Sequence, residues 1–378
     1  QKLVQSAFAG KPKDIISQSV AKALYGEVSP YSATRLERFA ACAFAHFLQY
    51  GMKLTERVEY EFKPMDMGNV MHEALESFAE EVRKRGMKWT ELTEQERNEI
   101  ADRCLDNIVA DYGNTVLKSS ARNEYMIERT RRILRRTVWA LQKQLEQGEF
   151  QPEGFEVTFG GGRIDRVDIM EDQNKVYVKV IDYKTGNTSF DLVYLYHGLQ
   201  LQLMIYLDGA LRVEQKKYPD KEIIPAGVFY YNIKDPMIQE KIDADVEAVS
   251  AGLMKELKMN GLVQADPELV YRMDSSLGSI PVAFNKDGSF RKNSSVADRT
   301  QFAVLGRYVR TKIEKIRSSI LEGDAEVSPY ELGKKNACTY CPYMTVCGFD
   351  RRLSGYEFRR LKNFSDEELW KAFDREAE

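Results

Sequence analysis

The sequence of 378 residues predicts an α/β domain in which apolar strands lie between amphipathic helices. The runs 161–168 and 176–184 are rich in β-branched residues, and Glu171-Asp172-Gln173-Asn174 separates them, which predicts a β-hairpin. A further apolar run at 224–233 predicts another buried strand. The segments before and after these strands repeat apolar residues with helical spacing. Strands that alternate with helices in this way are typical of α/β architectures.

The helices are predicted from this periodicity and from their start signals. Thr34-Arg-Leu-Glu37 and Thr93-Glu-Gln-Glu96 have the spacing of a capping box. We expect residues 1–29 to be a leader or linker, and 260–293 to be an irregular excursion that contains Gly and Pro. The helices are expected at about 34–49, 67–85, 93–112, 119–147, 198–211, 243–259 and 294–322.

The composition is that of an ordinary globular protein, with 43% hydrophobic and 30% charged residues. A net charge of −3 argues against a uniformly basic nucleic-acid coat, although local basic stripes remain open. No apolar run approaches the ~20 residues that span a membrane, and the chain shows no signal peptide. We therefore expect a cytoplasmic protein without membrane contact. Because the sequence does not begin with Met, we expect an excised part of a longer chain. The usual NTP-binding loop motif is missing from the sequence.

Charged side chains gather on one face of the predicted hairpin. Asp182 and Lys184 are two residues apart and share a face, because side chains alternate along a strand. With the loop centred on residues 172 and 173, Asp165 pairs with Val180 on that face, diagonal to Asp182. Two carboxylates at one place suit a hard divalent cation. Asp168 falls on the opposite face and is the weaker candidate, but a slip of one residue would exchange these assignments.

A surface hairpin with a wet, charged face is the simpler alternative. The run Val-Tyr-Val-Lys-Val-Ile before Asp182 opposes it, because so apolar a strand is expected to be buried on both sides. Acids at the end of a buried strand are more often functional.

Other polar residues have two interpretations each. His72 borders the apolar stripe near the start of its helix. It is either a structural residue or a metal ligand. Gln202 and Tyr206 are four apart, so they share a helix face and could reach one site. An arginine stripe on the helix at 119–147 is either a solvated face or a surface that tracks phosphates. This stripe consists of Arg129, Arg131, Arg132, Arg135 and Arg136.

Three cysteines, Cys338, Cys341 and Cys347, fall within ten residues and predict a metal site that needs a fourth ligand. Cys42 and Cys104 are the two remaining cysteines. Either one as the fourth ligand would close a very long loop at a tolerable entropic cost. Structural zinc and an iron–sulfur cluster both take four thiolates and remain open. A cytosolic disulfide is the less favoured alternative.

Four motifs in this order resemble the RecB-like branch of the PD-(D/E)XK nucleases. They are Gly68-x-x-x-His72, Gly-Arg-Ile-Asp165, Asp182-Tyr-Lys184 and Gln202-x-x-x-Tyr206. One Cys upstream of these motifs and a Cys-x2-Cys-x5-Cys downstream are similar to the iron–sulfur version of that branch. Over about residues 30–350 the likeness is greatest to the C-terminal nuclease domain of the B subunit of AddAB-type helicase–nucleases. Ala43 departs from the pattern, because the family often has Pro after the first Cys.

The resemblance implies a restriction-endonuclease-like core with a mixed sheet, flanking helices, helical insertions and an iron–sulfur staple that joins both ends. It implies a nuclease domain at 30–350 and a C-terminal extension at 351–378. The implied ligands of Mg²⁺ or Mn²⁺ are His72, Asp165, Asp182 and the carbonyl of Tyr183. Lys184 resembles the residue that positions the attacking water, with Gln202 and Tyr206 in support. The implied [4Fe–4S] ligands are Cys42, Cys338, Cys341 and Cys347.

By this resemblance we expect a metal-dependent exonuclease on single-stranded DNA. It would belong to a helicase–nuclease that processes double-strand breaks for recombination, with a helicase subunit and the rest of its own longer chain as partners. One alternative is a stand-alone nuclease resembling the CRISPR-associated RecB-like type. The other is a non-catalytic DNA-binding module that the cluster staples.

Overall fold

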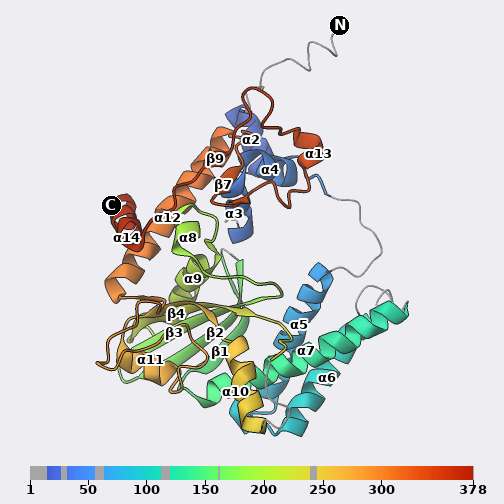
Figure 1. Cartoon of the computed structure of the whole chain (residues 1–378), viewed down its shortest axis with the longest axis vertical. Helices are drawn as coiled ribbons and strands as arrows, with labels where there is room; N and C mark the ends of the chain where they lie inside the picture. The colour runs from blue at the N-terminus through green and yellow to red at the C-terminus, as the bar shows by residue number, and fades with distance from the viewer. Residues whose placement is uncertain are drawn as a thin grey trace.

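A six-stranded mixed sheet forms the centre of the molecule (Figure 1). The computed structural model describes residues 15–26, 32–55, 64–111, 120–160, 162–238 and 245–377. The strands follow one another in chain order across the sheet; β3 pairs in parallel with β4, as does β5 with β6, and the other neighbours are antiparallel. They are β1 (Gln151–Phe159), β2 (Gly162–Asp172), β3 (Lys175–Lys184), β4 (Glu222–Asn232), β5 (Asn260–Gln264) and β6 (Val296–Ala297).

Helices cover both faces of this sheet, as Figure 1 shows. One face carries α5 (Pro64–Lys84), the 3₁₀ turn η2 (Trp89–Glu91), α6 (Glu94–Asp111), α7 (Ala121–Glu146) and α11 (Pro267–Met273). The other carries α2 (Gln18–Tyr25), α3 (Ala33–Ala41), α8 (Leu192–Tyr196), α9 (Gln202–Lys217), α12 (Arg299–Glu322) and α14 (Asp366–Ala377). The remaining helices are α4 (Ala43–His46), the π-helical η1 (Phe47–Gly51), α10 (Val246–Glu256) and α13 (Met344–Cys347).

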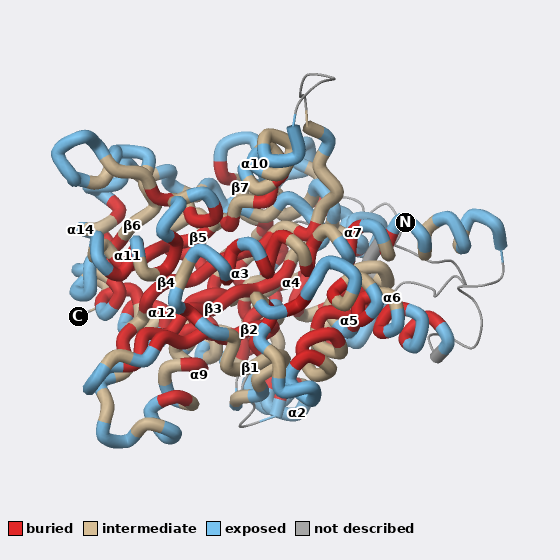
Figure 2. Tube along the Cα trace, turned by 90° about the horizontal axis from the view of Figure 1, so that it is seen from below, coloured by how far each residue is buried: buried red, intermediate tan, exposed pale blue. Residues whose placement is uncertain are grey.

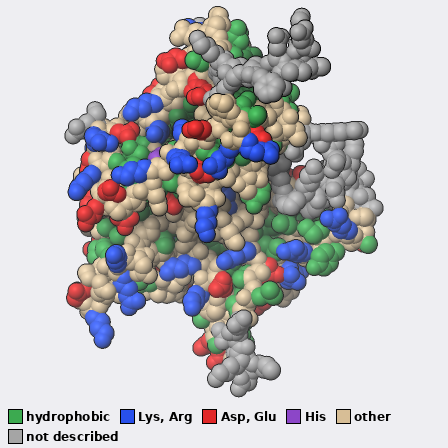
Figure 3. Space-filling view, turned by 45° about the horizontal axis from the view of Figure 1, so that its top comes forward, with side chains coloured by type: hydrophobic (Ala, Val, Ile, Leu, Met, Phe, Trp, Pro, Cys, Tyr) green, Lys and Arg blue, Asp and Glu red, His purple; other side chains and the backbone are tan. Residues whose placement is uncertain are grey.

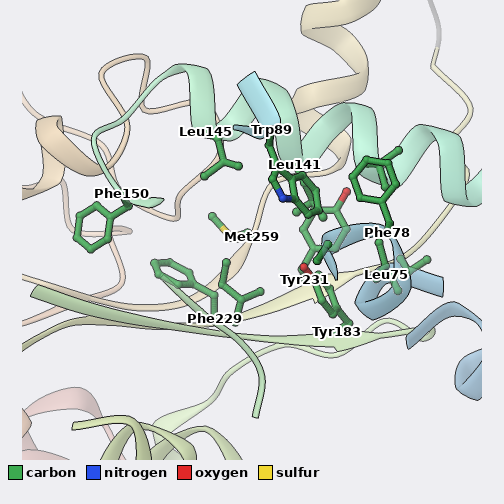
Figure 4. Close-up of a cluster of buried hydrophobic side chains, with 14 of the residues drawn as sticks. Leu75, Phe78, Trp89, Leu141, Leu145, Phe150, Tyr183, Phe229, Tyr231 and Met259 are labelled. Atoms are coloured by element: carbon green, nitrogen blue, oxygen red, sulfur yellow. The ribbon is translucent and has the colours of Figure 1, made fainter. Parts of the chain in front are cut away.

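β3 is buried along nearly its whole length, and Figure 2 shows the central strands coloured as buried. Its alternate side chains belong to two separate cores: Val178 and Val180 face α9 and α12, whereas Ile181 and Tyr183 face α5 and α7. The expectation of burial on both sides is therefore confirmed. In the second core, Leu141 and Leu145 of α7 point towards Phe229 of β4 (Figure 4). Burial of both faces makes this strand a rigid support for the groups at its end.

The predicted hairpin is present, but its register is shifted by two residues from the expected one. Val167 and not Asp165 lies opposite Val180, because the strands continue through the pair Asp172 and Lys175 and only Gln173 and Asn174 form the turn. A shift of two residues preserves which side chains share a face. The face assignments of the acids therefore hold, while their separation becomes smaller. Gly161 lies outside the described residues.

Several helix boundaries differ from those expected. The helix predicted from residue 34 begins one residue earlier, with Ser32 and not Thr34 as its N-cap, so no capping box forms there. It breaks at Cys42, whose backbone is extended (φ −166°, ψ 117°). By contrast, the predicted capping box of Thr93 and Glu96 is confirmed by bonds of 2.9 and 3.3 Å.

The helix expected at 198–211 is α9, which begins at Gln202 and continues to Lys217. The prediction of an irregular segment at 260–293 was wrong in part, because β5 and α11 lie within it. α12 begins only at Arg299, after β6 and the N-cap Asp298. These elements are short and lie between Gly and Pro signals, so periodicity did not distinguish them from loops.

The N- and C-terminal parts of the described chain lie together, beside α12 (Figure 1). Within the segment expected as a leader, α2 packs on α12 and buries Ala21 completely. Within the expected C-terminal extension, α14 packs on the same helix. A small sheet completes this region, with strands β7 (Tyr330–Leu332), β8 (Lys335–Asn336) and β9 (Arg359–Arg360).

Among the described residues, no helix combines the length and the apolar character that crossing a membrane would require.

Candidate functional site

Three carboxylates form a row across neighbouring strands of the central sheet. Glu156 of β1 lies between the pairs Phe155–Arg166 and Val157–Ile164, so it is opposite Asp165 of β2. The pairing of Arg166 with Ile181 brings Asp165 opposite Asp182 of β3 in turn. Asp165 is 9% exposed and Asp182 only 1%. The smaller separation that follows from the observed register thus places the two predicted acids side by side.

Asp165 is held by the backbone of the next strand. Its Oδ2 accepts a 2.7 Å hydrogen bond from the Tyr183 N–H. The N–H and C=O of one strand residue point to the same side of the strand. The Tyr183 carbonyl therefore faces the side of β3 on which Asp165 lies.

His72 reaches this row from α5. Its Nδ1 lies 3.3 Å from Asp165 Oδ2 and 4.0 Å from Glu156 Oε1. One ligand atom from each of these three residues lies within 4.8 Å of the others. One turn earlier, a Cβ on Gly68 would lie 3.3 Å from Thr185 Oγ1, just after β3. Glycine at this position therefore lets α5 approach the strand end closely.

Lys184 connects the acids to α9. Its Nζ lies 2.5 Å from Asp182 Oδ2 and donates a 2.8 Å hydrogen bond to Gln202 Oε1. The Gln202 amide in turn donates to the Tyr206 hydroxyl at 2.9 Å. The structure therefore brings together Asp182, Lys184, Gln202 and Tyr206 in one chain of contacts, as the sequence motifs predict.

Burial and the crowding of negative charge shift the pKa values of the site. Burial, reinforced by the Asp165 charge, raises the pKa of Asp182 to about 7 despite its contact with Lys184. Burial and Asp165 likewise raise the pKa of Glu156 to about 7. Burial alone would lower the pKa of His72, but its hydrogen bond to Asp165 and the surrounding carboxylates raise it above its ordinary value. Each shift indicates a site that lacks positive charge.

The donor set fits a divalent cation. A cavity of about 570 Å³ opens beside it, lined by His72, Glu156, Tyr183 and Lys184 among others. Asp182 Oδ2 is buried and accepts no hydrogen bond of acceptable geometry among the described residues, although the Lys184 ammonium lies close. Oxygen donors with one imidazole suit Mg²⁺ and Mn²⁺.

Glu156 was not singled out from the sequence. Its φ of 50° places a non-glycine residue in the left-handed region within a strand, an uncommon conformation that is found at functional sites. Arg163 forms an ion pair with the second oxygen of its carboxylate. The available signal was an acid within the apolar alternation of Phe155, Val157 and Phe159, but no strand had been predicted there.

Four of the five cysteines form a separate cluster. The break at Cys42 places this residue at the start of α4, where it packs with Tyr343 and Cys341 of the C-terminal loop. Burial raises the pKa of Cys338 to about 12, and the neighbouring thiols of Cys42, Cys341 and Cys347 contribute to this rise. The backbone N–H of Phe349 donates to Cys347 Sγ at 3.4 Å.

Cys104 belongs to a different part of the molecule. It is 4% exposed in the core between the sheet and α5, α6 and α7, where burial raises its pKa. Of the two spare thiols, Cys42 is therefore the one that lies with the cysteine triplet.

Two other candidates from the sequence, Asp168 and the arginine stripe, have neighbours that indicate a structural role. Asp168 is fully buried on the opposite face of the sheet, 2.5 Å from Arg166 Nε and 3.1 Å from Lys179 Nζ. In the arginine stripe, Arg131 pairs with Asp106 and Arg132 with Asp235, while Arg135 pairs with Asp102 and Arg136 lies over Trp139. These ion pairs favour a solvated face over a phosphate-tracking one. On the face of the molecule that Figure 3 shows, acidic side chains lie among the basic ones.

Comparison with known proteins agrees with these observations. The model of the PD-(D/E)XK nuclease superfamily matches residues 30–348. A protein of Lachnoclostridium phytofermentans, named as the B subunit of an ATP-dependent helicase/deoxyribonuclease, is 42% identical over 100% of this chain and 34% of its own length. Proteins with the same name in Thermoanaerobacter sp. and Clostridium acetobutylicum are each 35% identical over 96% of this chain and 34% and 33% of theirs. The chain thus spans about a third of the length of these curated relatives.

Three observations lead to one assignment: a mixed sheet with helices on both faces, a row of acids across neighbouring strands, and a family match over most of the chain. The chain belongs to the PD-(D/E)XK nuclease superfamily.

Proposed function

We propose that this chain is a divalent-metal-dependent deoxyribonuclease that hydrolyses phosphodiester bonds of single-stranded DNA as an exonuclease. The observation that carries the proposal is the convergence of His72, Asp165 and Asp182 beside the Lys184 ammonium. Convergence of a metal-ligand set and a positioned cationic side chain in one cavity is what this chemistry requires.

His72, Asp165, Asp182 and the Tyr183 carbonyl would hold Mg²⁺ or Mn²⁺. Glu156 would join them, because its carboxylate lies within 4.8 Å of the ligand atoms of His72 and Asp165. A cation bound there lowers the pKa of a bound water and offsets negative charge on the phosphate. The proximity of the His72 ring to Asp165 and the opposition of Asp165 and Asp182 support this ligand set.

Lys184 would hold the attacking water and stabilise negative charge in the transition state. Its ammonium is fixed between Asp182 and Gln202, so its position does not depend on bound DNA. Preorganised charges of this kind act strongly where water is excluded. Tyr206 orients Gln202 through the 2.9 Å hydrogen bond.

We further propose that the chain works within a helicase–nuclease that processes double-strand breaks for recombination. Its relatives are named as helicase/deoxyribonuclease subunits and are about three times as long. A helicase subunit and the remainder of a longer chain are then the expected partners, with residues 30–350 as the nuclease unit. A stand-alone nuclease of the CRISPR-associated type is the less favoured alternative, because those relatives carry the name of a helicase/deoxyribonuclease subunit.

The direct test is a digestion assay on single-stranded and plasmid DNA with Mg²⁺, with and without a chelator. We expect cleavage that the chelator abolishes. Asp182→Ala or Lys184→Ala should reduce the rate to below about a thousandth of the wild-type rate without unfolding the protein. Lys175→Ala, exposed at the other end of β3, serves as the matched control and should be fully active. Retained Mg²⁺-dependent activity in either active-site variant would refute the assignment.

We also propose that Cys42, Cys338, Cys341 and Cys347 bind a [4Fe–4S] cluster with a structural role. The clustering of these four thiols supports it. Their arrangement as one triplet and one distant partner, not two short pairs, favours iron–sulfur over zinc. Wild-type protein should be brown with absorbance near 400 nm, whereas Cys341→Ala should be colourless. A colourless wild type that contains zinc would overturn this proposal.

A further inference from the structure

The N-terminus of α9 is capped by a side chain from another helix. Its own N-cap residue, Leu201, provides no side-chain hydrogen bond. Instead, Glu37 Oε1 of α3 accepts from the backbone N–H of Leu201 at 2.7 Å and of Gln202 at 2.9 Å. The first N–H groups of a helix have no partner within the helix, so a carboxylate at this position satisfies two of them.

This cap is linked through Gln202 to Lys184, the lysine that is proposed to act in catalysis. Gln202, whose backbone Glu37 binds, is also the residue whose side chain accepts from Lys184. A continuous series of hydrogen bonds therefore runs from Glu37 through Gln202 to Lys184. Leu201 is fully buried, which leaves this end of α9 little freedom to find another partner.

We propose that Glu37 is a positioning residue, which caps α9 from α3 and thereby orients the Gln202 side chain against Lys184. This inference rests on the proposed nuclease function. The same helix, α3, is followed directly by Cys42, its C-cap residue. It therefore contacts the start of α9 through Glu37 and adjoins the cysteine cluster at its C-terminal end.

The expected effect follows from the loss of orientation. Without the cap, the first turn of α9 is free to shift and Gln202 no longer fixes the Lys184 ammonium. Displacement of a catalytic group by about 1 Å can cost about 100-fold in rate. We expect Glu37→Ala to lower kcat for single-stranded DNA about 10- to 100-fold, with little change in KM.

Three comparisons separate positioning from a general loss of stability. Glu37→Gln keeps an oxygen that accepts both N–H groups and should restore kcat to within about fivefold of wild type. Asp266→Ala removes a carboxylate that caps α11 by bonds from Glu268 N (3.0 Å) and Leu269 N (3.3 Å), and should leave kcat unchanged. If Glu37 acts through Gln202, the Glu37→Ala/Gln202→Ala double variant should be no slower than Gln202→Ala alone.

Amide hydrogen exchange provides a readout that does not depend on nuclease activity. The backbone amides of Leu201 and Gln202 should exchange faster in Glu37→Ala than in the wild type. In Glu37→Gln they should be protected nearly as well as in the wild type. Unchanged exchange in Glu37→Ala would overturn the inference even if the wild type proved inactive. So would full activity of Glu37→Ala, equal loss in Glu37→Gln, or additive losses in the double variant.

Discussion

Single residues of β2 show how position on a strand decides the role of an acid. Asp165 lies with the other carboxylates beside the cavity, whereas Asp168 lies on the opposite face of the sheet, between Arg166 and Lys179. Burial would raise the pKa of Asp168, but these two cations outweigh burial and lower it. Asp168 therefore stays charged and neutralises its neighbours.

Replacing Asp168 by alanine should destabilise the protein strongly. It would leave Arg166 and Lys179 buried without their counter-charge, at a cost of about 3–5 kcal/mol of unfolding free energy. Asp172→Ala on the same strand removes a 2.8 Å pair with Arg272 that is partly exposed, and should cost less than about 1 kcal/mol. Urea unfolding measures both, and equal losses would contradict the buried-network account.

Glu37 should make stability depend on pH. Burial raises its pKa to about 7, and the charge of Asp182 adds to this, although the backbone N–H groups of Gln202 and Leu201 and the charge of Lys184 lower it. The folded state therefore binds the proton more tightly than the unfolded state. This contribution to stability is complete below the ordinary pKa of 4.5 and is lost as the pH rises through about 7.

The corresponding measurement compares urea midpoints between pH 5 and pH 8. The wild-type midpoint should fall more over this range than that of Glu37→Gln, which has no proton to lose there. The difference should be at most roughly 3 kcal/mol. Parallel pH profiles for the two proteins would contradict it.

At the scale of elements, the close approach of α5 to the end of β3 sets the position of His72. Gly68→Ala should push these elements apart, because the added Cβ would lie 3.3 Å from Thr185 Oγ1. We expect Mn²⁺ affinity to fall about tenfold, as for other changes that support metal ligands indirectly. Gly306→Ala in α12 meets nothing closer than 3.7 Å and should retain full affinity. Titration calorimetry tests both, and tight binding in Gly68→Ala would refute the explanation.

The strands at the centre could be predicted from sequence, because runs of β-branched residues and the alternation of side chains identify a strand whatever its register with its neighbour. The register itself could not, since Glu171 and Asp172 look like turn residues but pair within the hairpin. Glu156 was missed because Pro152, Glu153 and Gly154 interrupt the first half of β1, which leaves only a short alternation from Phe155 to Phe159 as a strand signal. The true partner of Glu37 lies 164 residues away, so a local capping box was the only interpretation that spacing allowed.

At the scale of the whole molecule, the cysteine cluster connects segments from both ends of the described chain. Cys42 lies between α3 and α4, whereas the other three cysteines lie after residue 337, and the two parts share a small apolar core. The entropic cost of closing so long a loop is tolerable, because it grows only logarithmically with loop length. The cluster is therefore well placed to stabilise the assembly of these segments.

Cys42→Ser should loosen this region without disturbing the sheet. We expect faster limited proteolysis within about residues 335–355 and loss of absorbance near 400 nm. Cys104→Ser alters a buried thiol in the other core and should retain the absorbance, even if it lowers thermal stability. Mass spectrometry of the fragments locates the cuts, and identical patterns for the two variants would argue against a stapling role.

The central claim is that residues from α5, β2 and β3 hold one divalent cation. Mn²⁺ titration of wild-type protein and Asp182→Asn, followed by calorimetry, tests it most directly, and it also separates a nuclease site from a non-catalytic module. Wild type should bind Mn²⁺ at this site, and Asp182→Asn should bind it at least about tenfold more weakly. Equal affinity in the two proteins, or no binding in either, would contradict the account.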